Sequence, residues 1–81
     1  MIVSNYKIIQ IVNLLNLERK ITSEDMDVNL NQMGLTSLEF VKLVLMLEDY
    51  FGIENGEVLL FDLSTKLTVN RIVERLRGLE K

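Results

Sequence analysis

The 81-residue sequence contains no cysteine and no histidine. Without cysteine the chain has no disulfide framework, no thiolate nucleophile and no thiolate metal ligand. Without histidine it lacks the usual general base and the commonest metal ligand. A hydrolase or a metalloenzyme would have to rely on the other polar side chains, so the composition disfavours an enzyme. We predict neither catalytic residues nor a metal site.

Proline is also absent, and the four glycines are scattered, so no segment has low complexity. Hydrophobic residues make up 48% of the chain and charged residues 26%, which is the balance of a globular domain rather than of a disordered chain. A chain of this length buries one modest core, and no linker or internal repeat divides it. We therefore expect a single, monomeric domain over residues 1–81.

The net charge of −3 disfavours nucleic acid as a partner, because phosphate binding needs a basic surface. The chain does not begin with the basic region and apolar run of a signal peptide. The longest apolar stretch, 40–47, is interrupted by Lys42 and is too short to span a bilayer. These features predict a soluble, cytoplasmic protein that binds neither nucleic acid nor membranes.

Helical periodicity first appears after Ser4, a residue type suited to an N-cap. Apolar residues at i, i+3, i+4 and i+7 then predict one helix face and a helix that ends near Leu17. A long polar connection, 18–35, follows, and such connections are usually functional or pack themselves down. We expect its isolated apolar residues to pin it across the protein: Ile21, Met26, Val28, Leu30 and Met33.

The next helix should begin at Ser37 and end at Gly52. Thr36 and Glu39 have the form of a capping box. In that motif the Thr36 hydroxyl accepts a hydrogen bond from the Glu39 amide, and the Glu39 carboxylate accepts one from the Thr36 amide. The predicted core face of this helix consists of Phe40, Leu43, Val44, Leu47, Tyr50 and Phe51.

Residues 55–66 predict a short, irregular helix, because a lone strand would have no partner in this chain. Thr68 should cap a last helix with one apolar face, formed by Val69, Ile72, Val73, Leu76 and Leu79. Three main amphipathic helices, a short third one and a long first loop predict an all-α protein. The expected fold is a small four-helix bundle, since the apolar faces can only be buried against one another.

A second apolar strip lies opposite the predicted core face of the helix that begins at Ser37. Leu38, Val41 and Leu45 recur there at i, i+3 and i+7 within a mostly acidic rim, an arrangement that suits repeated docking of partner proteins. Periodicity alone equally allows contact with the short helix or the long loop. Ser37 also has two interpretations: a capping residue, or an exposed hydroxyl at a helix N-terminus, where an attached phosphate is favoured.

The run 33–38, MGLTSL, resembles the signature of the acyl carrier protein family. In that family a glycine, an aspartate, the modified serine and a leucine open a helix that ends in acidic and aromatic residues. The stretch 47–53, LEDYFGI, is similar to that helix end, and 67–69, LTV, is similar to the family's entry to its last helix. The likeness spans nearly the whole chain in register. The signature positions read Gly34, Thr36, Ser37 and Leu38.

The resemblance implies an acyl-carrier fold with Ser37 as the attachment site. A phosphopantetheinyl transferase, using coenzyme A and Mg²⁺, would transfer 4′-phosphopantetheine to the Ser37 hydroxyl, and the thiol of the arm would carry acyl or aminoacyl groups as thioesters. The cofactor would thus bring the sulfur that the chain lacks. Other implied partners are an acyl- or aminoacyl-loading enzyme and synthase or transferase enzymes. The residues matching the family's partner contacts are Leu38, Val41 and Leu45, with Glu48 and Asp49 facing basic patches.

Three departures from the family pattern bear on the pathway. Thr36 stands where many members have an aspartate that can help to hold the transferase's metal. Lys42 occupies a position that is frequently acidic in fatty-acid carriers, and 55–66 lacks their acidic third helix. These departures favour a free-standing carrier in a polyketide, non-ribosomal peptide or other specialised pathway.

Two alternatives belong to other functional classes. The first is an unmodified helical interaction module that keeps the carrier fold and binds partners through the apolar strip. The second is an enzyme that uses Ser37 with a carboxylate such as Glu39 or Glu48. It is disfavoured because a serine nucleophile needs a base and an oxyanion site, and neither a histidine nor a suitable lysine lies near Ser37 in the sequence.

Overall fold

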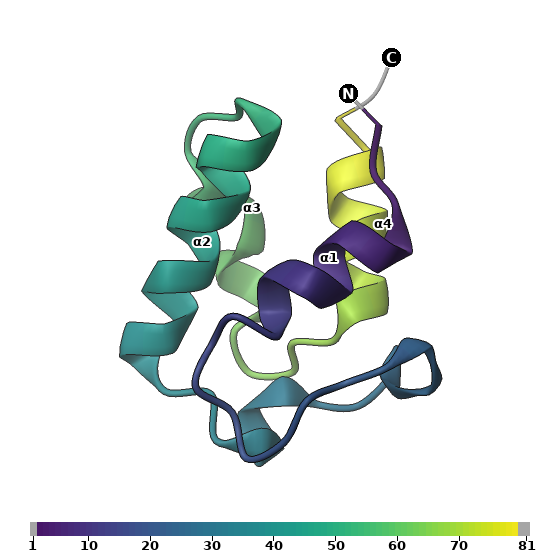
Figure 1. The fold of residues 1–81 in the computed structure, drawn as a ribbon. Helices are drawn as coiled ribbons and strands as arrows, with labels where there is room; N and C mark the ends of the chain where they lie inside the picture. Colours follow the sequence, from purple (N-terminus) through teal and green to yellow (C-terminus); the bar gives the residue numbers. More distant parts are fainter. Residues whose placement is uncertain (1, 80–81) are drawn as a thin grey trace.

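Four α-helices and three short 3₁₀ helices form the computed structural model, which describes residues 2–79. In Figure 1, α1 lies beside α4, α2 stands next to α3, and the connection between α1 and α2 runs along one end. No strand occurs in the described part, so the predicted all-α four-helix fold is confirmed. The elements are α1 (Asn5–Val12), η1 (Ser23–Asp25), η2 (Leu30–Met33), α2 (Ser37–Phe51), α3 (Gly56–Leu60), η3 (Phe61–Leu63) and α4 (Val69–Arg77).

The predicted caps start and end these helices. The Ser4 hydroxyl accepts from the Lys7 amide at 3.1 Å, and the Thr68 hydroxyl accepts from the Arg71 amide at 3.1 Å. Gly52, in the left-handed region at φ 66°, ends α2. The buried residues of the three main helices come from the predicted faces: Ile8, Ile11, Val12, Leu43, Val44, Leu47, Val69, Ile72, Val73 and Leu76.

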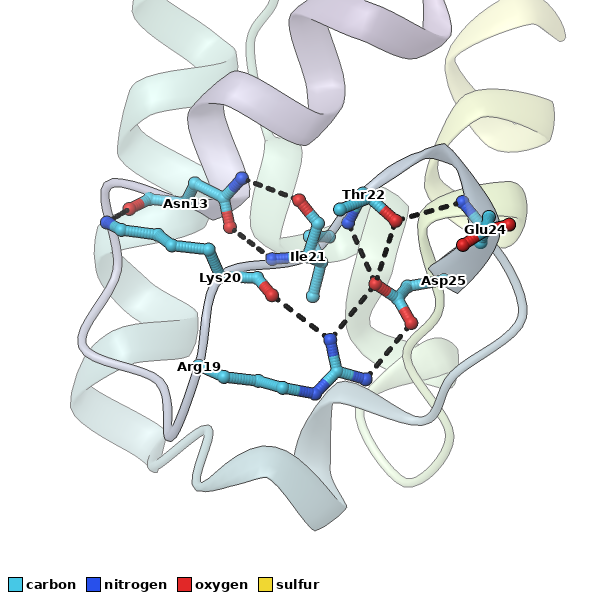
Figure 2. A network of polar contacts seen from close by, with 7 residues as sticks. All are labelled: Asn13, Arg19, Lys20, Ile21, Thr22, Glu24 and Asp25. Atoms are coloured by element: carbon cyan, nitrogen blue, oxygen red, sulfur yellow. Dashed lines mark hydrogen bonds and ion pairs between the residues drawn. The ribbon is translucent and has the colours of Figure 1, made fainter.

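The first helix is shorter than its apolar period predicts, because α1 ends at Val12 rather than near Leu17. The reason is that Asn13 uses its side-chain amide to bind the main chain of Ile21, accepting from its N–H at 2.8 Å and donating to its carbonyl at 2.9 Å (Figure 2). These bonds draw the following loop against the end of the helix. Leu15 is still buried, but from a turn.

The connection between α1 and α2 packs onto the bundle as predicted. Ile21, Leu30 and Met33 are buried, and the other two apolar residues of this segment pack against the core. The Leu30 amide donates to the Leu67 carbonyl at 2.8 Å, and the Asn70 amide donates to the Met26 carbonyl at 3.0 Å. The connection is therefore fixed to the entry of α4.

Two predicted core residues lie at the surface instead. Tyr50 is 54% exposed, because its ring stands in the cleft between α1 and α2, where the Lys7 ammonium lies 4.6 Å from its centroid. Leu79 is 42% exposed, since α4 ends at Arg77 and the apolar face ends with it. Phe40 and Phe51 are half-buried at the margin of the core.

The segment 55–66 forms the short α3 and then η3, which confirms the predicted irregular helix. The N-terminus of α3 sits very close to α2. A Cβ atom on Gly56 would lie only 2.9 Å from Glu48 Cγ and 3.3 Å from a methyl group of Val44. Glycine is therefore required at this contact, and the Glu48 carboxylate accepts from the Gly56 amide at 2.8 Å.

Candidate functional site

Ser37 is the first residue of α2 and is exposed to solvent. Thr36 caps the helix: its hydroxyl accepts from the Glu39 amide at 3.2 Å. Within the described residues the Ser37 hydroxyl makes no hydrogen bond. The capping interpretation of Ser37 is thus wrong, and its hydroxyl is free for chemistry.

The turn that carries Ser37 is held from both sides by the loop after α1. On one side, the Asn16 amide donates to the Glu39 carboxylate at 2.7 Å. On the other, the Glu18 amide donates to the Met33 carbonyl at 2.9 Å. Gly34 provides the sharp change of direction between them, at φ 91°. We call these two hydrogen bonds the loop brace.

The predicted capping box is only half present, because the Glu39 carboxylate does not return to the Thr36 amide. Glu39 is 6% exposed and is committed to the loop brace through Oε1. Its Oε2 lies 3.4 Å from Lys42 Nζ and accepts no hydrogen bond. Glu39 is therefore a buried positioning carboxylate at the start of α2 rather than a capping or surface group.

A groove of about 300 Å³ opens beside Ser37, between the start of α2 and the α3–η3 segment. Its walls combine apolar side chains with hydroxyl, amide and carboxylate groups. The Asn31 side chain, which donates to the Ser64 carbonyl at 2.7 Å, fixes one end of it. The lining residues are Asn31, Leu35, Thr36, Ser37, Phe40, Val41, Glu57, Phe61 and Ser64.

The apolar strip of α2 faces solvent next to this groove. Leu38, Val41 and Leu45 are 66%, 47% and 58% exposed, respectively. Such exposure removes the alternative in which these residues are covered by the short helix or the long loop. A row of exposed apolar side chains leading from Ser37 is a surface suited to protein contact.

A family model described as a phosphopantetheine attachment site matches residues 9–76, which is most of the chain. The chain belongs to the phosphopantetheine attachment site family. The resemblance to acyl carrier proteins is confirmed, and members of this family bear a covalent 4′-phosphopantetheine. No curated protein and no solved structure matches the sequence.

For a phosphopantetheine protein, the surroundings of Ser37 fit the cofactor. A phosphodiester needs an accessible hydroxyl, and the N-terminus of a 15-residue helix favours the phosphate charge. The groove offers hydrogen-bonding groups from Asn31, Thr36 and Ser64 and an apolar wall from Phe61. These side chains would hold the part of the arm closest to the protein.

The two acidic residues implied as partner contacts differ in their surroundings. Glu48 is half-buried and its carboxylate binds the start of α3, whereas Asp49 is exposed and borders the cleft between α1 and α2. Neither lines the groove at Ser37. The structure thus does not gather them with the apolar strip into one acidic surface.

Two exposed apolar residues beside the site were not expected as contact residues. Val58 is 76% exposed and Phe61 is 68% exposed. The sequence contained a signal for them, since an apolar run of Val58–Phe61 on a five-residue helix cannot turn every side chain inward. Residues 2–79 contain no cluster of potential metal ligands and no helix long and apolar enough to cross a membrane.

Proposed function

We propose that the protein is a free-standing carrier whose 4′-phosphopantetheine arm is attached to the Ser37 hydroxyl. One observation carries the assignment: Thr36 caps α2, and so the Ser37 hydroxyl is left exposed and unpaired at the helix N-terminus. The family match supports the cofactor. The groove beside Ser37 supports the position.

The attachment chemistry requires only the hydroxyl from this chain. The Ser37 oxygen forms a bond to the phosphorus that bears pantetheine in coenzyme A, the diphosphate bond breaks, adenosine 3′,5′-bisphosphate leaves and the hydroxyl proton is lost. The transferase and its Mg²⁺ supply the catalysis. When bound, the arm supplies a terminal thiol that forms thioesters with acyl or aminoacyl groups.

The chain itself presents the arm and is recognised; we propose no catalytic residue in it. The apolar strip supports recognition by the transferase, by a loading enzyme and by synthase or transferase enzymes. Thr36 and Lys42, at positions often acidic in fatty-acid carriers, favour a polyketide, peptide or other specialised pathway. Cytoplasmic location and monomeric state stay predictions.

Intact mass spectrometry tests the attachment after incubation with coenzyme A, Mg²⁺ and a broad-specificity phosphopantetheinyl transferase. We expect the parent to gain one phosphopantetheine and Ser37→Ala to gain none. Ser23→Ala is the matched control, because Ser23 is also exposed and also follows a threonine cap, and it should be modified like the parent. Modification of Ser37→Ala would move the site elsewhere.

An unmodified interaction module is the second candidate, supported by Thr36 in place of the aspartate and by the exposed strip. Absence of modification in the folded parent with several transferases would favour it. In cells, this module would lose partner binding on Leu45→Glu and would tolerate Ser37→Ala. A carrier would lose function with either change.

A further inference from the structure

The exposed apolar surface at Ser37 extends beyond α2. Val41 and Phe61 line the groove together with Ser37, and Phe61 lines the neighbouring hollow with Val58 and Glu57. The strip on α2 is thereby continuous with the outer side of α3 and η3. We call this surface the carrier face; its apolar members are Leu38, Val41, Leu45, Val58 and Phe61.

Two of the three carboxylates of α2 point away from the carrier face. Glu39 is buried and bound to the Asn16 amide at 2.7 Å. Glu48 is bound to the Gly56 amide at 2.8 Å. A carboxylate that already accepts an internal hydrogen bond would lose it on turning towards a partner, so neither gives the face an acidic character.

The charges that do border the carrier face nearly cancel. Lys42, between Leu38 and Leu45 on the same side of α2, has a side chain that is 57% exposed. Glu57 stands at the rim of the groove. Asp49, the remaining carboxylate of α2, borders a different cleft, which also contains Lys7 and Lys20. The ammonium of Lys42 is therefore the charge that α2 itself places beside the strip.

We propose, building on the proposed carrier function, that the carrier face takes a partner surface that is apolar and bears a carboxylate opposite Lys42. A basic patch, which the family resemblance implies for the partners, would meet Lys42 and find the nearest α2 carboxylates already bonded. Burial of apolar area then supplies the affinity, and this contribution is not weakened by salt. Association led by opposite charges on exposed surfaces is weakened by salt.

The test measures the Michaelis constant of a broad-specificity phosphopantetheinyl transferase for this carrier, at about 0.05 M and about 0.5 M NaCl, where screening lengths differ severalfold. The variants are Lys42→Glu, Lys42→Gln and Leu45→Glu. Arg71→Glu is the matched control: it changes the net charge by as much as Lys42→Glu, and Arg71 is an exposed residue of α4 outside the carrier face. Lys42→Gln avoids placing a new carboxylate next to Glu39.

For the parent we expect the Michaelis constant to change less than about threefold with salt. At low salt, Lys42→Gln and Lys42→Glu should raise it in that order, with Arg71→Glu unchanged and Leu45→Glu raised at both salt concentrations. A parent value that rises more than about tenfold with salt, or a lower value for Lys42→Glu, would overturn the inference while leaving the carrier function intact. A parent that is never modified would instead remove the carrier function itself.

Discussion

The backbone amide of Asn16 lies 2.7 Å from Glu39 Oε1 and ties the turn after α1 to the first turn of α2. With the bond from the Glu18 amide to the Met33 carbonyl, it completes the loop brace on either side of Ser37. Ser37 is therefore presented from a fixed turn, although 13 residues that form neither an α-helix nor a strand follow Glu18 up to the start of η2 at Leu30, apart from the three of η1. The brace predicts that Glu39 matters for stability and for modification.

Replacing Glu39 by alanine should lower the free energy of unfolding by about 1–3 kcal/mol, because the Asn16 amide loses its acceptor. Glu39→Gln retains a side-chain oxygen at the same place and should recover much of this loss. Chemical denaturation gives the free energies, and amide hydrogen exchange at Asn16 reports the bond directly. Equal exchange rates at Asn16 in the parent and in Glu39→Ala would show that the brace does not form in solution.

The capping pattern correctly predicted the start of α2 but not the role of Glu39. Thr36 and Glu39 have the spacing of a capping box, and the half that depends on adjacent backbone geometry, Thr36 to the Glu39 amide, is present. The other half competes with a donor 23 positions earlier, and Asn16 wins the carboxylate. Local spacing does not contain such a long-range donor, so the sequence alone leaves it out.

The same distinction explains the other outcomes. The helix faces and the exposure of Leu38, Val41 and Leu45 follow from a 3.6-residue period and are confirmed. The early end of α1 depends on Asn13 binding Ile21, and the exposure of Tyr50 depends on where α1 crosses α2. These results are set by tertiary contacts, and periodicity carries no information about them.

The margin of the core can be tested with two large-to-small substitutions on α2. Leu47 is 1% exposed, so Leu47→Ala should lower the free energy of unfolding by about 2–5 kcal/mol. The sequence alone predicts an equal loss for Phe40→Ala, but Phe40 is half-buried, and we now expect a smaller loss. Urea denaturation of both variants gives the comparison, with Tyr50→Ala as an exposed control. A larger loss for Phe40→Ala than for Leu47→Ala would contradict this packing.

Gly56→Ala should destabilise the contact between α2 and α3. The added methyl group would lie 2.9 Å from Glu48 Cγ, and overpacking of this kind costs about 1–3 kcal/mol. In a Glu48→Ala background the opposing Cγ atom is absent, so Gly56→Ala should cost less there. A double-mutant cycle from thermal or urea unfolding measures this coupling. Additive losses would mean that Gly56 is not required by its contact with Glu48.

The ion pair between Arg19 and Asp25 predicts a local dependence on pH. The Arg19 guanidinium binds both carboxylate oxygens at 3.0 Å, and the Thr22 amide binds one of them at 2.8 Å (Figure 2). Hydrogen bonding by Arg19 first, and by the Thr22 backbone second, lowers the pKa of Asp25 from 3.8 to about 2.

Because the pKa of Asp25 is lower in the folded chain than in the unfolded one, the pair stabilises the fold fully above the unfolded value of 3.8. Its contribution should fade as the pH falls from 3.8 towards about 2. An NMR titration of the Asp25 side-chain carboxyl carbon tests this directly. Arg19→Ala should raise the midpoint towards 3.8 but leave it somewhat low, since the Thr22 bond persists, and Arg71→Ala should not change it. A parent midpoint at the ordinary value would mean that Arg19 and Asp25 do not pair in solution, and that the loop around η1 is held by its backbone contacts alone.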